Sequence, residues 1–184
     1  LPSYQKKVHS PKIKFKKIRK YNNDIIFIGT WEPERGVFFK KLIQLGINIK
    51  IYGIKWNKDP YFKFLKSHII LGHVNDPKYS NLIFNSKIAI CLPSVGNNDD
   101  ITKKSIEIPA IGTLLCATRT ASHKKVFKEN KEAIFFKDAK ECYLKCSKLL
   151  LDQKKIHKIA YRGHIKITKN LKTDFETVIK KIVK

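Results

Sequence analysis

The chain has 184 residues, of which 42% are hydrophobic and 11% aromatic, and its 39 Lys and Arg against 15 Asp and Glu give a formal net charge of +24. This length corresponds to about one domain and excludes a complete two-domain enzyme, while the apolar content excludes a wholly disordered chain. No run approaches the roughly 18 uninterrupted apolar residues of a membrane-spanning helix, and the basic start lacks the apolar core of a signal peptide.

Residues 1–20 hold eight cations, two prolines and no acidic residue, and their apolar residues follow no clear period. This composition is typical of a linker or an extended arm. The chain begins at Leu1 and contains no Met, which predicts a piece of a longer polypeptide. We therefore expect a basic linker or arm over residues 1–20 and a structured domain over residues 21–184.

From residue 24 onward, short apolar runs alternate with segments of helical spacing. The apolar runs are residues 24–29, 48–53, 69–74, 87–92, 113–117 and 132–136. Each is short and nearly continuously apolar, as expected for a strand covered on both faces. Helical spacing is present at residues 34–45, 76–85, 102–111 with an interruption at Pro109, 138–151, and as two helices within 152–184.

This alternation predicts an α/β fold, a Rossmann-like doubly wound parallel sheet of about six strands with helices at its C-terminal end. Ligands of such sheets bind at the carboxyl ends of the strands, near the point where the strand order reverses. The loops that follow the predicted strands are therefore the places to look for chemistry. They come after Ile28, Tyr52, Leu71, Leu92 and Ala117.

The first of these loops contains Gly29, Thr30 and, at the start of the next helix, Arg35. A glycine there lets the backbone approach a phosphate, and an arginine in the first helical turn can donate two charge-assisted hydrogen bonds to that phosphate. The loop is neither a dinucleotide fingerprint nor a P-loop, because GxGxxG and GxxxxGK are both absent. The alternative is a plain chain turn at Gly29 and a solvated Arg35.

Residues 91–117 run from one predicted strand through a polar loop and a short helix into the next strand. Glu107 is a lone carboxylate among apolar neighbours on that helix. A carboxylate in this position can accept two hydrogen bonds from the vicinal hydroxyls of a ribose, although an ordinary surface glutamate is the alternative. Asp99 and Asp100 are weak evidence for a metal, because hard cations need several convergent oxygens, so we expect no metal.

The four cysteines, Cys91, Cys116, Cys142 and Cys146, form no CxxC pair and have no histidines at zinc-like spacing. Cys91 and Cys116 lie in apolar runs, and Cys142 and Cys146 would share one face of a helix. We expect buried free thiols in a reducing cytoplasm.

The positive charge is carried mostly by lysine, because arginine stands at only four positions: Arg19, Arg35, Arg119 and Arg162. Proteins that recognise the edges of bases or bind phosphate groups favour arginine, whose guanidinium forms two parallel hydrogen bonds. Abundant isoleucine and asparagine beside scarce alanine indicate AT-rich coding, to which we attribute most of the charge. Arg119 follows the strand at 113–117 and is a second candidate for phosphate binding.

Several blocks along the chain resemble, in order, the carboxyl-terminal donor-binding domain of CgeB-type (spore maturation protein-like) glycosyltransferases, a branch of the glycosyl transferases group 1 with the two-lobed GT-B architecture. The blocks are DIIFIGTWEPERG, INIKIYGIKW, LGHV, YSNLIFNSKIAICL, DDITKKSIEIPAIGTLLCA and VFKENKEAIFFKD. The resemblance covers essentially the whole chain.

The resemblance implies that Gly29, Thr30 and Arg35 face the diphosphate of a donor and that Glu107 binds its ribose. Lys104 stands where the family usually has arginine. The lysine keeps the positive charge but cannot form the paired hydrogen bonds of a guanidinium. Asp99 stands eight residues before Glu107, where related enzymes have a glutamate, and is a possible catalytic residue. The nucleobase would be bordered by Gly53, Gly72, His73 and Val74.

The implied activity is transfer of a sugar from a nucleotide-sugar such as a UDP- or GDP-sugar to an unknown acceptor, without a metal cofactor. We expect the acceptor site on a missing amino-terminal Rossmann domain, and a cytoplasmic location with possible contact to an anionic membrane surface. Two other hypotheses stay open: a nonenzymatic lysine-rich module for nucleic acid or anionic surfaces, although no specific nucleic acid is expected, and a related fold that has lost catalysis.

Overall fold

The computed structural model describes residues 2–9, 15, 19–94 and 100–182. Within these residues, six strands form one parallel sheet in the order β3-β2-β1-β4-β5-β6. The strands are β1 (Asn23–Ile28), β2 (Ile49–Gly53), β3 (Ile69–Leu71), β4 (Ser86–Cys91), β5 (Leu114–Thr118) and β6 (Ile134–Phe136). The order reverses between β1 and β4, which confirms the expected doubly wound, Rossmann-like fold.

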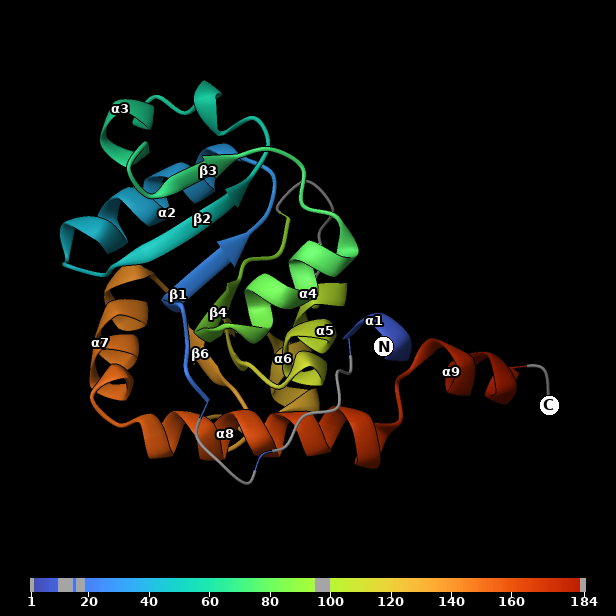
Figure 1. Cartoon of the computed structure of the whole chain (residues 1–184). Helices are drawn as coiled ribbons and strands as arrows, with labels where there is room; N and C mark the ends of the chain where they lie inside the picture. The colour runs from blue at the N-terminus through green and yellow to red at the C-terminus, as the bar shows by residue number, and fades with distance from the viewer. Residues whose placement is uncertain (1, 10–14, 16–18, 95–99, 183–184) are drawn as a thin grey trace.

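Helices cover both faces of this sheet (Figure 1). They are α1 (Lys6–His9), α2 (Pro33–Gln44), α3 (Phe62–Leu65), α4 (Asp76–Phe84), α5 (Lys103–Ile111), α6 (Ala121–Val126), α7 (Ala139–Leu150), α8 (Gln153–Ile165) and α9 (Phe175–Ile182), with a 3₁₀ turn at Trp56–Lys58 and a π-helical continuation of α8 at Lys166–Leu171. None of these described helices is long and apolar enough to cross a membrane.

The alternation of side chains along β1 shows why its sequence is continuously apolar. Ile25 and Phe27 pack into the core under α2 and α7, while Ile26 and Ile28 pack into the core under α4 and α5. Because successive side chains of a strand point to opposite faces, a strand covered on both sides needs apolar residues at every position.

The helices that the sequence did not predict are short. The 3₁₀ turn and α3 form around the fully buried Trp56 and Leu65, and α6 is capped by the Thr120 hydroxyl, which accepts from the His123 amide. The expected interruption at Pro109 was wrong, because α5 continues to Ile111. Burial of its last turn and a left-handed Gly112 at φ 83° hold the helix there.

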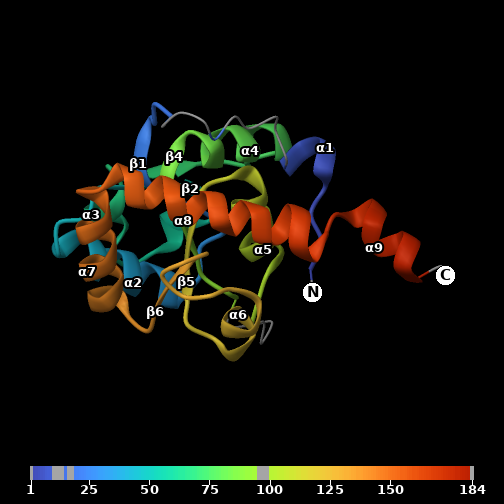
Figure 2. The same cartoon turned by 90° about the horizontal axis from the view of Figure 1, so that it is seen from below.

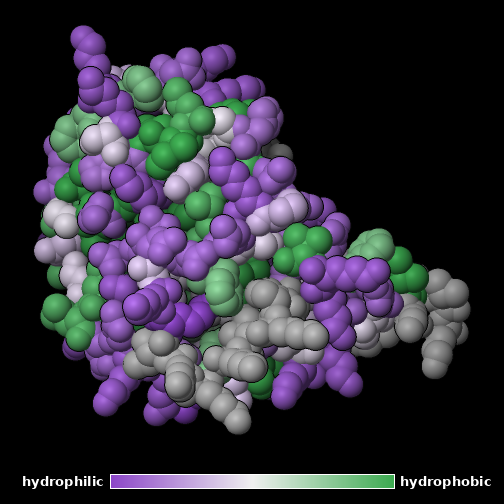
Figure 3. All heavy atoms as spheres, in the orientation of Figure 1, coloured by the Kyte–Doolittle hydropathy of each residue, from purple (hydrophilic) through white to green (hydrophobic). Residues whose placement is uncertain are grey.

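The start of the described chain packs beside the segment that leads into α9. Tyr4 is 3% exposed and pairs with Asp174, and α1 contacts α4 and α5. The described residues of the expected arm therefore pack on the domain, while residues 10–14 and 16–18 lie outside the described part. Beyond Asp174, α9 projects from the body, as seen from two directions (Figures 1 and 2), and its Phe175 and Ile179 are exposed. In the space-filling view, hydrophilic residues cover most of the visible face, with hydrophobic residues scattered between them (Figure 3).

Candidate functional site

A cavity of about 380 Å³ opens at the carboxyl edge of the sheet, where β1, β4, β5 and β6 end. Its lining combines apolar and charged side chains. It consists of Glu32, Glu34, Arg35, Phe38, Leu92, Pro93, Ser94, Asp100, Thr118, Thr120, Phe136 and Lys137. The cavity thus lies beside the reversal of the strand order, between β1 and β4, where open α/β sheets bind their ligands.

Arg35 joins the loops that follow β1 and β4. Its Nη1 donates to the Thr30 carbonyl at 2.6 Å, and its Nη2 donates to the Leu92 and Pro93 carbonyls at 3.4 and 3.5 Å. Glu32 forms an ion pair with the same Nη2 at 3.1 Å. Burial lowers the pKa of Arg35, and Glu32 opposes this shift. Arg35 is therefore a brace on the cavity wall, with much of its hydrogen-bonding capacity already used.

Lys104 approaches the same loop from the first turn of α5. Its Nζ donates to the Ile28 carbonyl at 2.6 Å, at the end of β1. Burial lowers the pKa of Lys104, and the neighbouring Arg35 lowers it further, whereas Cys91 and Glu107 raise it. An ammonium group has three N–H donors, and within the described residues Lys104 uses one of them, so two remain for a ligand.

The backbone of Gly29 is itself part of the fold's packing. Its amide donates to the Tyr52 carbonyl at 2.9 Å, and its carbonyl accepts from Trp56 Nε1 at 2.9 Å. Gly29 therefore offers no free amide to a phosphate, while Thr30 next to it is exposed. The structure thus brings Gly29, Thr30, Arg35 and Lys104 together. Among the described residues, donors without a partner remain on Thr30, on Lys104 and at the buried Arg35 Nε.

Glu107 lies one helical turn beyond Lys104 on α5 and is partly buried against α4. Burial raises the pKa of Glu107, while Lys104 lowers it. Its neighbour Tyr79, which the sequence did not single out, is 6% exposed, and burial and Glu107 together raise its pKa well above the usual value. Among the described residues the Tyr79 hydroxyl has no hydrogen-bond partner of good geometry. The Tyr79 hydroxyl is itself buried and faces Glu107, so the half-buried Glu107 carboxylate is the member of this pair that a ligand can reach.

The four residues expected beside a nucleobase lie at the ends of β2 and β3. A side chain at Gly53, where φ is +152°, would bring its Cβ within 2.0 Å of the Gly29 carbonyl, so this glycine lets the two loops approach. Gly72 donates its amide to the Gly53 carbonyl at 3.1 Å. Gly72 and His73 are exposed and Val74 is half-buried. None of the four lines the cavity described above.

Arg119 is held by carboxylates instead of facing the cavity. Its Nη2 lies 2.8 Å from Glu129 and 2.5 Å from Glu141, and Lys145 pairs with both glutamates. Hydrogen bonds to Glu141 and Glu129 raise the pKa of Arg119. Because these carboxylates occupy its guanidinium, we leave Arg119 out of the proposed site; no local sequence pattern indicates such partners. Asp99 lies outside the described residues.

A buried network that the sequence did not reveal fixes the first turn of α5. His123 is fully buried, and its Nε2 and Nδ1 lie 2.8 Å from Ser105 Oγ and 2.9 Å from Thr120 Oγ1. Thr120 Oγ1 also donates to the Asp100 carbonyl at 2.7 Å. Because Ser105 follows Lys104, this network sets the position of Lys104 at the sheet edge.

A family model described as "Glycosyl transferase-like" matches residues 35–174. No curated protein matches the sequence significantly. Among solved structures, sucrose-phosphate synthase from Thermosynechococcus elongatus aligns with a TM-score of 0.73 at 11% identity, over 98% of this chain and 49% of that one. The C-terminal domain of the glycosyl transferase group 1 family protein LpcC from Francisella tularensis aligns at 0.68 and 15%, over 91% and 98%.

The Anabaena protein Alr3699/HepE, solved in complex with UDP and glucose, aligns with a TM-score of 0.68 at 13% identity, over 88% of this chain and 47% of that one. At these identities the likeness shows the fold alone, which is that of one GT-B lobe. The chain spans about half the length of the synthase and of the Anabaena protein, and nearly all of the isolated LpcC domain.

Proposed function

Because the chain belongs to the glycosyl transferase-like family, we propose that it is the lobe of a GT-B glycosyltransferase that binds a nucleotide-sugar donor. The observation that carries this proposal is the convergence of Arg35, Lys104 and Glu107 at the reversal of the strand order, beside a cavity of about 380 Å³. The Anabaena structures with UDP and with UDP-glucose support the class of donor.

The diphosphate, the ribose and the sugar of the donor each meet a group suited to them. The diphosphate lies against Thr30 and the Lys104 ammonium, with Arg35 fixing the loop behind them. The Glu107 carboxylate accepts hydrogen bonds from the ribose hydroxyls, because an ionised carboxylate is an acceptor only. Glu32, Glu34 and Asp100 in the cavity wall are acceptors for the hydroxyls of the sugar.

In the proposed reaction the bond between the anomeric carbon and the phosphate oxygen breaks, and the sugar is transferred to an acceptor. Negative charge accumulates on the leaving diphosphate while the sugar gains oxocarbenium character. A buried cation beside the diphosphate stabilises that charge more than an exposed one, because little water screens it. Lys104 is the residue of this chain best placed for that task. No metal is part of the proposal.

The finer assignments belong to the same proposal. The sequence blocks named above support the CgeB-type branch, and four free, buried thiols support a reducing compartment such as the cytoplasm. The acceptor is unknown, and its site is placed on another lobe. We therefore expect this chain by itself to bind a donor but hardly to turn it over.

The test is isothermal titration calorimetry with UDP, GDP and UDP-glucose. We expect one saturable site, and Glu107→Ala weakens binding by about ten- to a hundredfold, the effect of losing hydrogen bonds to a charged group. Glu176→Ala, which removes an exposed carboxylate on α9, is the matched control and leaves affinity unchanged. A folded chain that binds none of these nucleotides, or binds them equally well without Glu107, overturns the proposal.

A further inference from the structure

The outer face of α8 and its π-helical continuation carries a group of exposed cations, which we call the basic row. The row consists of Lys154, Lys155, Lys158, Arg162 and Lys169. Lys154, Lys158 and Arg162 stand four residues apart, so their side chains share one side of the helix. The buried side chains of α8 lie on its other side, against the domain. The basic row therefore faces away from the core.

The charge of the basic row is not compensated by neighbouring acids. Between Asp152 and Asp174 the sequence contains no Asp or Glu. Among the described residues, none of the five cations forms an ion pair, whereas Arg119 and Lys145 are both paired with glutamates. The outer face of α8 thus presents a continuous positive charge to whatever binds there.

Exposed apolar side chains accompany these cations. Leu151, at the corner between α7 and α8, is 89% exposed, more than any other large hydrophobic side chain that the structure describes. Tyr161 is 44% exposed, and its ring lies 5.0 Å from that of Phe15. The two rings line a groove of about 540 Å³ together with Lys158 and Lys169. Cations and apolar groups are therefore available on the same face.

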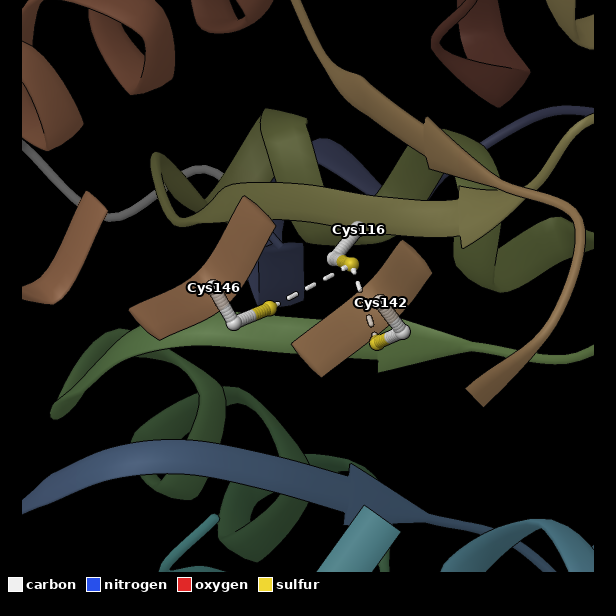
Figure 4. A group of neighbouring side chains, drawn as sticks. All are labelled: Cys116, Cys142 and Cys146. Carbon is white, nitrogen blue, oxygen red and sulfur yellow. Dashed lines mark hydrogen bonds between the residues drawn. The ribbon is translucent and has the colours of Figure 1, made fainter. Parts of the chain in front are cut away.

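This face is fixed in place by the core and lies apart from the donor cavity. No residue of α8 lines that cavity, and α8 crosses in front of the domain when the molecule is seen from below (Figure 2). α8 packs on α5, α7 and β5. The buried Cys116, Cys142 and Cys146 pack α7 on β5, with sulfur atoms 3.8 and 3.9 Å apart (Figure 4). A partner at α8 does not compete with the donor.

The length and composition of the face select the kind of partner. From Lys154 to Lys169 the basic row spans about 20 Å, which is too long for one phosphate group. Lysines beside exposed leucine and tyrosine are typical of contact with anionic membranes, where cations meet the headgroups and apolar side chains enter the boundary with the acyl chains. A nucleic acid would leave Leu151 exposed, and proteins that recognise nucleic acids favour arginine, which stands at one of the five positions.

We propose that the outer face of α8, formed by the basic row with Leu151 and Tyr161, is a docking surface for a membrane rich in anionic lipids. The five cations lie at the phosphate groups of the lipids, and Leu151 and Tyr161 enter the region below the headgroups. No bond is made or broken. The donor cavity stays open while the membrane is bound, and the proposal does not depend on the proposed donor function.

The test is co-sedimentation of the full chain with phosphatidylcholine vesicles, with and without the anionic lipid phosphatidylglycerol. We expect binding to the anionic vesicles only, with an affinity that falls as salt is added. Each cation at such a surface raises affinity about fivefold, so Lys158→Gln with Arg162→Gln weakens binding about twenty- to thirtyfold. The matched control, Lys63→Gln with Lys66→Gln, removes two exposed lysines at α3, far from α8 (Figure 1), and leaves vesicle affinity unchanged.

A second pair of variants tests the apolar part of the surface. Leu151→Ser weakens vesicle binding about tenfold, the effect of losing the burial of a leucine side chain. Leu71→Ser, which replaces an exposed leucine on β3, is the matched control and leaves it unchanged. Circular dichroism shows whether each variant is folded. UDP binding is measured separately, so failure of the donor proposal is distinguishable from failure of this one.

Four results overturn the proposal. They are absence of binding to the anionic vesicles, equal binding to neutral and anionic vesicles, equal loss in the two double lysine and arginine variants, and an unchanged affinity in Leu151→Ser. A single-stranded oligonucleotide that binds more tightly than the vesicles would assign the surface to nucleic acid instead. Loss of vesicle binding in Phe175→Ser but not in the α8 variants would place the contact on α9, which also contradicts the proposal.

Discussion

Glu107 is the residue at which proposed binding and folding stability oppose each other. Its carboxylate accepts the strongest hydrogen bonds from a ribose when it is ionised, yet burial raises its pKa and so disfavours the ionised form. Lys104 one turn earlier partly offsets this effect. A group held in an unfavourable charge state by its surroundings is typical of functional sites.

The pH dependence follows from the direction of this shift. A carboxyl group whose pKa is higher in the folded than in the unfolded chain stabilises the fold when protonated, and that contribution is lost as the pH rises through the folded-state pKa. Glu107→Gln keeps the neutral form at every pH. We expect this variant to melt at a higher temperature than the wild-type chain at pH 8, with a difference that shrinks toward pH 4.

Donor binding changes in the opposite direction. Wild-type affinity for UDP falls as the pH drops below the raised pKa of Glu107, whereas Glu107→Gln binds weakly and with little pH dependence. Calorimetry at several pH values and thermal melts of both proteins measure the two effects. A Gln variant that melts lower than the wild type at pH 8 would show that the ionised carboxylate stabilises the fold, contrary to this assignment.

Sequence reasoning at this scale found residues but not their partners. The order of the loops placed Arg35 near the end of β1, and the resemblance to the glycosyltransferase family added Lys104; both residues are found there. The order of the loops placed Arg119 there as well, because an arginine after a strand matches the same pattern. The pairing of Arg119 with Glu129 and Glu141 depends on how β6 and α7 pack, which no local pattern contains. The Tyr79 hydroxyl lies beside Glu107 because α4 packs against α5, which the sequence pattern likewise does not contain.

At the scale of elements, the strands were predictable because burial on both faces makes central strands such as β1, β4 and β5 continuously apolar. The edge strand β3 is only partly buried, yet its short apolar run was sufficient to identify it. The short helices were not predictable, since a helix of four to six residues has too few turns to show a period. Residues 62–65 are helical because Leu65 is buried and Asp59 holds the preceding turn through the Tyr61 amide. Such helices depend on tertiary contacts, which also decided the outcome at Pro109.

The joint between β1 and β2 depends on Gly53. An alanine at this position meets two costs, a backbone at φ +152° and a Cβ within 2.0 Å of the Gly29 carbonyl. Gly72→Ala is the matched control, because φ is +135° there and no atom lies within 4 Å of the added Cβ. In Gly72→Ala only backbone strain lowers the free energy of unfolding, by about 1–3 kcal/mol.

We expect Gly53→Ala to lose at least about 2 kcal/mol more than Gly72→Ala, because backbone atoms of two strands must separate. Urea unfolding followed by circular dichroism gives both free energies of unfolding. The same displacement moves Gly29 and Thr30, so UDP affinity also falls in Gly53→Ala. Equal losses of stability in the two variants would mean that the two loops do not depend on close contact.

For the whole molecule, the question is how much of the +24 charge acts in binding. Some of the cations are neutralised within the fold: Arg35 by Glu32, Lys87 by Asp24, and Arg119 and Lys145 by Glu129 and Glu141. Most other lysines lie on the surface, where salt screens them over about 10 Å. The proposed donor contacts involve one or two partly buried cations, which are screened less.

The salt dependence of binding separates these two populations of charge. Affinity driven by surface lysines falls with a slope of about −0.9 in log K against log salt for each phosphate neutralised, so a contact with six or more phosphates loses about a thousandfold between 50 and 200 mM salt. A diphosphate held by Lys104 releases few counterions. We expect UDP binding to weaken by less than about tenfold over that range, and Lys104→Met to weaken it at every salt concentration.

Lys140→Met, which replaces an exposed lysine of α7, is the control and leaves UDP affinity unchanged. A steep salt dependence that Lys104→Met does not alter would assign binding to the lysine-rich surface, and the chain would then act as a module for anionic surfaces.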